Sequence, residues 1–356
     1  FSLNTGRLRD QWHGMSRTGT LGRLFGHVSE PALDLHPLDM ARLGLRTGDL
    51  VHVRSRHGTL IVPVASDDGL LPMQTYLAMH WGPEALGGAG LDSQGAHGVN
   101  GLTTPVFCPT SKQPELKHTA VSVQPISLPW GLAAAAWLPA DQALRVREEL
   151  KPWMQRFAFA SCVMFGREEV SAAGAPSERL GVHVRAAHPH EPKHLEDSVG
   201  IADLLADLTD KLGIGGLGAA DVMRYENAAR GQHRAIRLHR DGETLRLGAY
   251  MLAGDTQSQA WLHPMLRDGA GLPNAGAWLL QACVDAPAAE AASRATAGKQ
   301  VCACFDVSDL AIQAALHAAP SLRDPAQRVH HVQASLKCGT GCGSCVPTSR
   351  KMAASL

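Results

Sequence analysis

The stretch LVHVRSRHGTLIVPVA, residues 50–65, alternates apolar and polar side chains on both sides of His57-Gly58. A period of two is typical of half-buried strands, and a glycine-containing break between two such runs indicates a hairpin. The runs at residues 73–81 and 120–126 predict further strands. Because many short strands alternate with Gly and Pro, the first region is predicted to be a compact β-barrel with few helices.

A short helix is predicted just before this hairpin. Pro37 is suited to a first helical turn, and Gly44 supplies a stop after Leu43. Gly48-Asp49 then turns the chain into the hairpin.

The overall composition excludes several classes of protein. With 356 residues, the chain has the length of two or three domains. Hydrophobic residues make up 45%, which is enough for real cores and excludes a wholly disordered chain. Lys+Arg and Asp+Glu are both 33, so the basic excess of a nucleic-acid or membrane-surface binder is missing, and no apolar run approaches the length of a membrane span. We therefore expect neither a nucleic-acid nor a membrane partner.

The opening residues, FSLNTGRLRDQWH, lack the charged and apolar regions of a signal peptide. The first residue is Phe1 rather than Met, and a motif-like sequence follows at once. We therefore expect the chain to begin inside a longer protein.

Residues 129–298 read as a mixed α/β segment. An amphipathic helix is predicted at 141–150, with Pro152 ending or kinking it. Further expected elements are helices at 200–212, 258–267 and 277–284, a hairpin around Asp241-Gly242 within 235–252, and an Ala-rich linker at 286–298.

Two patterns in this segment resemble functional motifs, a GxGxxG match and a group of histidines, but the surrounding sequence argues against both functions. Residues 213–218 match GxGxxG, but a helix pattern precedes them where a dinucleotide fingerprint needs a strand, so a helix stop and a loop are predicted. His183, His188, His190 and His194 are interrupted by prolines, and we interpret them as a solvated loop rather than a metal site.

Five of the eight cysteines fall in the last 55 residues. Cys302-x-Cys304 and Cys342-x-x-Cys345 form two close pairs, each before a predicted helix, and Cys338 lies nearby. Four thiolates can enclose either zinc or an iron–sulfur cluster. The other three, Cys108, Cys162 and Cys283, are expected to be small buried hydrophobes.

The helix starts after these pairs suit an anionic cluster. Ser308 is the expected N-cap of a helix at 309–317, and Pro347 falls in the first turn of the helix after Cys345. Free N–H groups at a helix start stabilise negative charge, and the glycines at 339, 341 and 343 permit close approach to the sulfurs.

This spacing resembles the bacterioferritin-associated ferredoxin-like [2Fe–2S] domain, over residues 299–356. The resemblance implies a small helical domain with Cys302, Cys304, Cys342 and Cys345 as cluster ligands. Cys338 is an additional thiol, and zinc remains the alternative metal.

The first region carries a possible pyrophosphate site. Thr5-Gly6-Arg7 offers a hydroxyl, an unhindered N–H and a guanidinium within three residues, and Trp12 and His13 offer a flat face and a donor for a pterin or guanine.

The run LNTGRLRDQWHGMSRTG, with VNGLT and SKQPELKHTAV further on, resembles the dinucleotide-binding domain of molybdopterin oxidoreductases. The resemblance covers residues 1–128 and implies a double-psi-like β-barrel. The residues it places at the cofactor are Asn4, Thr5, Gly6, Arg7, Gln11, Trp12, His13, Thr18, His80, Asn100 and Lys117.

The order of these regions resembles the catalytic subunit of bacterial assimilatory nitrate reductases, an α+β multidomain enzyme. That family implies a Mo-bis(molybdopterin guanine dinucleotide), the [2Fe–2S] cluster, a cytoplasmic location and nitrate as substrate. It also implies an electron donor: a ferredoxin, a flavodoxin or an NADH-dependent reductase. The molybdenum ligand and a [4Fe–4S] cluster are expected only upstream, so this chain should contain no catalytic residue and be inactive alone. The alternatives are a non-enzymatic iron–sulfur electron-transfer or scaffold protein and part of a formate dehydrogenase-like enzyme.

Overall fold

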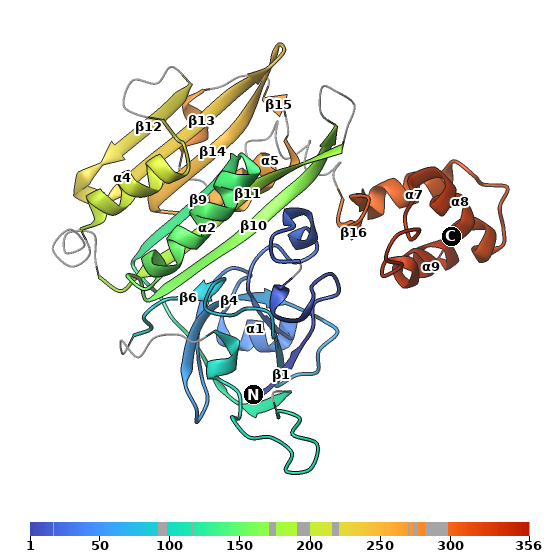
Figure 1. The fold of residues 1–356 in the computed structure, drawn as a ribbon, viewed down its shortest axis with the longest axis horizontal. Helices are drawn as coiled ribbons and strands as arrows, with labels where there is room; N and C mark the ends of the chain where they lie inside the picture. The colour runs from blue at the N-terminus through green and yellow to red at the C-terminus, as the bar shows by residue number, and fades with distance from the viewer. Residues whose placement is uncertain are drawn as a thin grey trace.

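The computed structural model describes residues 1–16, 18–91, 98–115, 117–170, 176–190, 200–215, 221–269, 271–272, 276–281 and 298–355. Two large sheets form the body of the molecule, and a small helical lobe projects from it (Figure 1). Among the described helices, none combines the length and apolar character that a membrane span requires.

Helices occur in all three parts of the chain. The α-helices are α1 (Pro37–Leu43), α2 (Ala140–Met154), α4 (Ile201–Lys211), α5 (Gln259–Asp268), α7 (Asp309–His317), α8 (Pro325–Leu336) and α9 (Val346–Ala354). The 3-10 turns are η1 (His13–Met15), η2 (Gly22–Phe25), η3 (Val99–Gly101), η4 (Ala228–Arg230) and η5 (Ala277–Leu280).

The first sheet is barrel-like and nearly closed. Its order is β7-β1-β5-β2-β4-β3-β8. These strands are β1 (Ser2–Gly6), β2 (Leu33–Leu35), β3 (Leu50–Arg54), β4 (Thr59–Ser66), β5 (Gln74–Ala78), β7 (His118–Ala120) and β8 (Ser122–Pro125). The two edge strands, β7 and β8, are consecutive in the chain and joined through Val121, which brings the sheet edges to one point. The strand predicted at 120–126 is confirmed as β8, while Ala120 ends the neighbouring strand β7: β7 pairs with β1, and β8 pairs with β3.

The predicted helix and hairpin of this sheet are confirmed. Helix α1 runs from Pro37 to Leu43, and Gly44 ends it in the left-handed conformation at φ 67°. Strands β3 and β4 pair antiparallel around the His57-Gly58 turn. Their apolar positions enter one core with the apolar residues of β1, β2 and β5.

The second sheet has the order β12-β13-β14-β9-β11-β10-β6, with β15 beside β14. Its strands are β6 (Leu86–Gly87), β9 (Trp130–Leu138), β10 (Phe159–Val170), β11 (Pro176–His188), β12 (Val222–Asn227), β13 (Gln232–Asp241), β14 (Thr244–Gly254) and β15 (Gly271–Leu272). Strand β6 belongs to the first region of the chain, so the two sheets share a covalent and hydrogen-bonded boundary.

Alanines in β9 let helices pack on both faces of this sheet. Ala134 and Ala136 share a core with residues of α2 and α4, whereas Ala133 and Ala135 share one with α5. Because successive strand residues point to opposite faces, the Ala run of β9 serves both cores. Figure 1 shows α2 and α4 over the same face.

Several predictions for the middle segment are confirmed. Helices α4 and α5 and the β13–β14 hairpin lie where the sequence placed them. Residues 213–215 follow the end of α4, with Gly213 at φ 59°, as expected for a helix stop; residues 216–218 lie outside the described residues.

The helix predicted at 141–150 is confirmed as α2, although it continues through Pro152 and ends two residues later, at Met154. The prediction for two histidines is wrong. His183 and His188 are buried on β11, where alternation with Val182 and Val184 makes a strand, rather than in a solvated loop.

His190 lies just beyond β11 and donates its N–H to His188 Nδ1 at 3.1 Å, while His194 lies outside the described residues. The helix predicted at 277–284 is a 3-10 turn, η5, in its described part. The predicted linker, except for Gly298, also lies outside the described residues.

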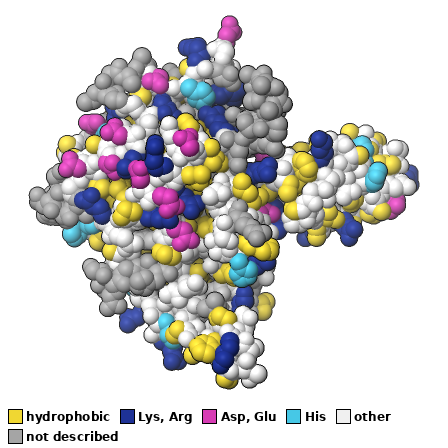
Figure 2. All heavy atoms as spheres, in the orientation of Figure 1, with side chains coloured by type: hydrophobic (Ala, Val, Ile, Leu, Met, Phe, Trp, Pro, Cys, Tyr) yellow, Lys and Arg dark blue, Asp and Glu magenta, His cyan; other side chains and the backbone are white. Residues whose placement is uncertain are grey.

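The C-terminal lobe has its own small core. Strands β16 (Gln300–Cys302) and β17 (Val307–Ser308) pair, and α7, α8 and α9 surround Val301, Ile312 and Val332. Figure 2 shows this lobe projecting from the body, with Lys and Arg side chains interleaved with hydrophobic ones near the junction.

Candidate functional site

The ends of two parallel strands create the first candidate site. Strands β1 and β5 pair in parallel, with Gly6 opposite Ala78, so the residues that follow each strand emerge at the same edge. Strand β7 runs antiparallel to β1 and begins at this edge, where the Thr5 N–H donates to the Lys117 carbonyl at 3.2 Å. The strand order thus brings the segments after β1, after β5 and before β7 together, although they lie far apart in the sequence.

The turn after β1 is braced by its own polar side chains. Gln11 is buried, and its backbone carbonyl accepts from Arg7 Nη2 at 3.3 Å. Thr18 Oγ1 donates to Gln11 Oε1 at 2.6 Å and accepts from the Trp12 N–H at 3.0 Å. The Arg7 guanidinium lies over the Trp12 ring, 5.4 Å from its centroid. Gln11 and Thr18 therefore shape the turn that displays Arg7, Trp12 and His13.

His80 follows β5 and interacts electrostatically with Arg7 and His13 of this turn. It is 2% exposed, and neither ring nitrogen has a hydrogen-bond partner among the described residues. Burial lowers the pKa of His80, and the nearby charges of Arg7 and His13 lower it further. A neutral imidazole with unused polar atoms is thus held beside a guanidinium.

Lys117 and Asn100 complete the edge. Lys117 is exposed, with Nζ 3.9 Å from Met79 Sδ. Asn100 is exposed on η3, which is fixed to the β5 side by a Val99 N–H to Trp81 carbonyl bond of 3.1 Å. Two cations, an aromatic face and an unsatisfied imidazole fit the phosphates and ring of a dinucleotide.

Sequence reasoning missed Tyr76. Its hydroxyl donates to the Arg7 carbonyl at 3.2 Å, and a Cβ on Gly6 would lie 3.0 Å from Tyr76 Cε2. Gly6 therefore packs closely against the Tyr76 ring, and a larger residue there would displace the ring. The sequence carries no local signal for this contact, which depends on the parallel pairing of β1 with β5.

The second candidate site is a group of five cysteines in the C-terminal lobe. The sulfurs of Cys302, Cys338 and Cys345 all lie within 4.8 Å of one another. Cys304 Sγ lies 3.3 Å from Cys342 Sγ, and Cys338 Sγ lies 3.6 Å from Cys345 Sγ. Two of the predicted ligands, Cys302 and Cys345, thus lie in one buried group with Cys338, and the other two, Cys304 and Cys342, form a pair beside it. An all-sulfur donor set fits an iron–sulfur cluster.

The predicted helix starts near these thiols are confirmed. Cys345 is the N-cap of α9, Pro347 lies in its first turn, and Ser308 caps α7 by accepting from the Ala311 N–H at 3.2 Å. Gly339 adopts φ 88°, a left-handed conformation in which a Cβ would also meet Val346 Cγ2 at 2.8 Å.

The thiols differ in environment. The hydroxyl of Ser344, 2.9 Å from Cys342 Sγ, lowers the pKa of Cys342, while burial raises the pKa of Cys345. Away from the group, Cys162 is buried as expected, and burial raises its pKa to about 12. Cys108 is exposed on a loop, so its assignment as a buried hydrophobe is wrong, and Cys283 lies outside the described residues.

Comparison with known families matches both terminal regions. Residues 1–120 match the Molydopterin dinucleotide binding domain, and residues 300–355 match the BFD-like [2Fe-2S] binding domain. The chain therefore carries a molybdopterin dinucleotide-binding domain and a [2Fe–2S]-binding domain.

Similar proteins include two nitrate reductases. One from Klebsiella oxytoca is 30% identical over 353 residues, which cover 99% of this chain and 33% of that protein. One from Shewanella frigidimarina is 30% identical over 145 residues, 35% of this chain and 15% of that protein. The chain thus spans about a third or less of the length of these relatives. Among solved structures, acetylene hydratase from Pelobacter acetylenicus matches with a TM-score of 0.29 and 20% identity over 35% of this chain and 18% of that chain.

Proposed function

We propose that this chain forms the dinucleotide-binding and electron-entry part of a molybdenum-dependent nitrate reductase that serves nitrate assimilation in the cytoplasm. The observation that carries the proposal is the similarity to the Klebsiella nitrate reductase over 353 residues, which includes both matched domains and the segment between them. A similarity confined to either domain would favour an unrelated electron-transfer protein equally well.

The division of the chain follows the same proposal. Residues 1–128 would form the dinucleotide-binding barrel of double-psi type, 129–298 a connecting region, and 299–356 the [2Fe–2S] domain. Support comes from the parallel β1–β5 and β2–β4 pairs within an otherwise antiparallel barrel-like sheet, and from the separate core of the C-terminal lobe.

At the first site, Arg7 and Lys117 would neutralise phosphates, while Trp12 and His13 would hold a ring of the dinucleotide. Asn4, Thr5, Gly6, Gln11, Thr18, His80 and Asn100 would supply the surrounding donors, acceptors and turn geometry. The bound cofactor would provide a metal centre that exchanges two electrons with substrate, and the protein provides binding and orientation.

At the second site, Cys302, Cys304, Cys342 and Cys345 would ligate the cluster. Cys304 faces Cys342, and Cys302 interacts with Cys345. Cys338 is as buried as Cys345, and its sulfur is 3.6 Å from Cys345 Sγ and 3.5 Å from Ser349 Oγ. Two facing pairs suit a two-iron cluster, and Cys338 would be a buried neighbour.

Nitrate reduction to nitrite takes two electrons, whereas a [2Fe–2S] cluster passes one at a time. A ferredoxin, a flavodoxin or an NADH-dependent reductase would supply them. We expect the full-length parent to form nitrite from nitrate with reduced viologen as donor. The 356-residue chain alone should accept an electron but form no nitrite, because none of its proposed site residues is a molybdenum ligand. Nitrite formation by this chain, or a parent that oxidises formate and ignores nitrate, would contradict the proposal.

A further inference from the structure

The cysteine group has one open edge. Cys302, Cys338 and Cys345 are buried, whereas Cys342 is exposed and Cys304 is half-buried. The sulfurs of Cys304 and Cys342 lie 3.3 Å apart, so these two residues together form the accessible edge of the group. An electron that enters or leaves through the protein surface meets this edge first.

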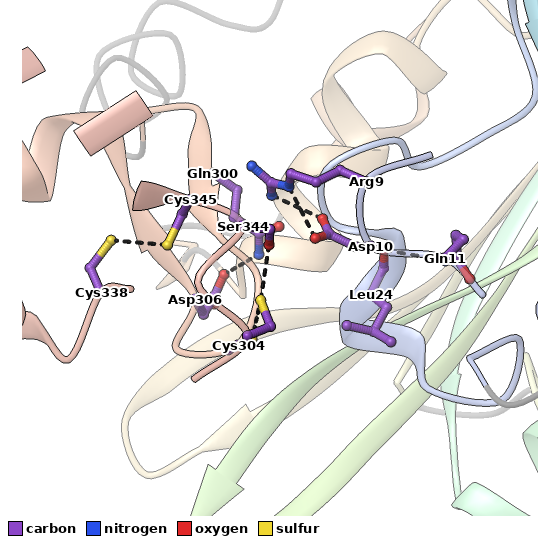
Figure 3. A network of polar contacts seen from close by, with 11 residues as sticks. Arg9, Asp10, Gln11, Leu24, Gln300, Cys304, Asp306, Cys338, Ser344 and Cys345 are labelled. Carbon is purple, nitrogen blue, oxygen red and sulfur yellow. Dashed lines mark hydrogen bonds and ion pairs between the residues drawn. The ribbon is translucent and has the colours of Figure 1, made fainter. Parts of the chain in front are cut away.

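An ion pair from the N-terminal domain lies at that edge. Arg9 Nε and Nη2 donate to the two carboxylate oxygens of Asp10 at 3.0 and 2.9 Å. Their side chains are only 22% and 5% exposed, although both lie in a surface turn. Figure 3 shows the pair beside Ser344 and Cys304, opposite the turn that carries Cys345.

Charge links this pair to the thiols. Arg9 interacts electrostatically with Cys345 and Cys342, and Asp10 interacts with Cys342. Arg9 and Asp10 therefore act on the cysteine group with opposite signs.

A second contact fixes the same junction. Gly26 lies against the Gln300 side chain, and a Cβ at Gly26 would approach Gln300 Oε1 to 2.4 Å. Gln300 lies two residues before Cys302, and its Nε2 donates to Asp306 Oδ1 at 2.6 Å, which fixes its side chain. The next residue, His27, interacts electrostatically with both Arg9 and Lys299, so the two parts of the chain meet here.

The turn with Arg9 and Asp10 also belongs to the dinucleotide site. Arg7 precedes the pair by two residues, and its bond to the Gln11 carbonyl closes the turn around it. One short segment therefore presents Arg7 to the dinucleotide and Arg9 to the cysteine edge.

We propose that the Arg9–Asp10 pair positions the open Cys304/Cys342 edge of the [2Fe–2S] cluster against the dinucleotide-binding domain and sets the reduction potential of the cluster. This inference rests on the ligand set proposed above. Reduction adds one electron, and thus one negative charge, to the cluster, without any bond being formed or broken. A guanidinium at the edge stabilises the reduced form and a carboxylate the oxidised form, because nearby charge tunes such potentials.

The charge effect is tested in the full-length protein by a dithionite titration monitored through the paramagnetic signal of the reduced [2Fe–2S] cluster. Arg9→Gln should shift the midpoint potential to a more negative value, and Asp10→Asn should shift it to a more positive one. Arg9→Lys keeps the charge and should stay close to the parent. The matched control is Arg42→Gln, which removes an arginine paired with Asp39 at 2.8 Å on α1 and should leave the potential unchanged.

The positioning effect is tested by hydrogen exchange of the backbone amides at residues 7–11 and 342–345. Gly26→Trp places a wedge between Gly26 and Gln300 and should speed exchange in both segments. Arg9→Gln should do the same, and Arg9→Lys should restore part of the protection.

The two hypotheses fail in different ways. A parent protein without iron and acid-labile sulfide at the C-terminal cysteines would contradict the proposed ligands. An intact cluster whose potential is the same in Arg9→Gln, Asp10→Asn and the parent would overturn the role of the ion pair.

Discussion

The two proposed cofactor sites are built in opposite ways. The cysteine group comes from two short segments of one small lobe, its donors are of one chemical kind, and three of its five thiols are buried. The dinucleotide site comes from four segments between Asn4 and Lys117, and its charged groups, Arg7 and Lys117, are exposed. The first is fixed by local spacing and helix starts, and the second by which strands are neighbours.

This difference sets what a mutation can do. Removing one ligand from a compact thiolate group leaves the remaining donors unable to complete the coordination of the metal. Removing one phosphate contact from an extended site leaves the others in place. The cysteine site should therefore fail in an all-or-none manner, and the dinucleotide site should weaken by degrees.

The largest effect is expected from Cys345→Ser, compared with Cys338→Ser. Both thiols are buried and their sulfurs are 3.6 Å apart, so the two variants are closely matched. Cys345→Ser should lose nearly all iron and acid-labile sulfide, whereas Cys338→Ser should retain both. Metal and sulfide analysis of the purified proteins checks this. Loss of the cluster in Cys338→Ser would show that Cys338 is a ligand, and stoichiometric zinc without sulfide would contradict the cluster itself.

A graded effect is expected at the dinucleotide site. A hydrogen bond between charged groups contributes about 1.5–3 kcal/mol, so Arg7→Ala or Lys117→Ala should each weaken cofactor retention roughly tenfold or more. Molybdenum and guanine nucleotide are measured in the full-length protein after dialysis. Arg54→Ala, an exposed arginine of β3 in the same sheet, is the control and should retain the cofactor. Full cofactor loading in both test variants would contradict the assignment.

The same contrast explains how much the sequence could predict. Cys302, Cys304, Cys342 and Cys345 are close in space because short spacings and helix caps bring them there, and these features are visible in one sequence. The proximity of His80 and Lys117 to Arg7 follows from strand order, which alternation of apolar residues does not encode. Only a family resemblance placed them at one site in advance.

Errors in the middle segment have a related cause. The prolines near His183 and His188 predict a solvated loop, yet β11 is an interior strand and buries both. His183 stacks on His263 of α5, with ring centroids 3.9 Å apart. Burial lowers the pKa of His183 to about 3, so its ring stays neutral in the core. A polar residue on a buried strand is recognised only when its tertiary partner is known.

The smallest predicted effect concerns Asp34, a partly buried carboxyl of β2 that is paired in register with Tyr76. Burial, together with the charge of Asp67, raises the pKa of Asp34 from 3.8 to about 7. Between these values the folded state holds a proton that the unfolded state has lost, so the free energy of unfolding falls as pH rises through this window. Above about pH 7 the penalty is constant, and below about pH 4 it is absent.

Asp34→Asn removes this penalty and should therefore stabilise the barrel-like domain at pH 8 but not at pH 4. One pKa unit corresponds to about 1.4 kcal/mol, and since solvent screens a partly exposed group, we expect a gain of about 2 kcal/mol. That gain corresponds to a rise of roughly 5 °C in the unfolding midpoint, measured by calorimetry at both pH values. Asp68→Asn, an exposed neighbour of Asp67, is the control and should change neither midpoint. Asp34 lies opposite Tyr76, whose hydroxyl donates to the Arg7 carbonyl, so the charge on Asp34 would destabilise strand pairing beside the dinucleotide site. Equal unfolding midpoints for Asp34→Asn and the parent at pH 8 would contradict this destabilisation.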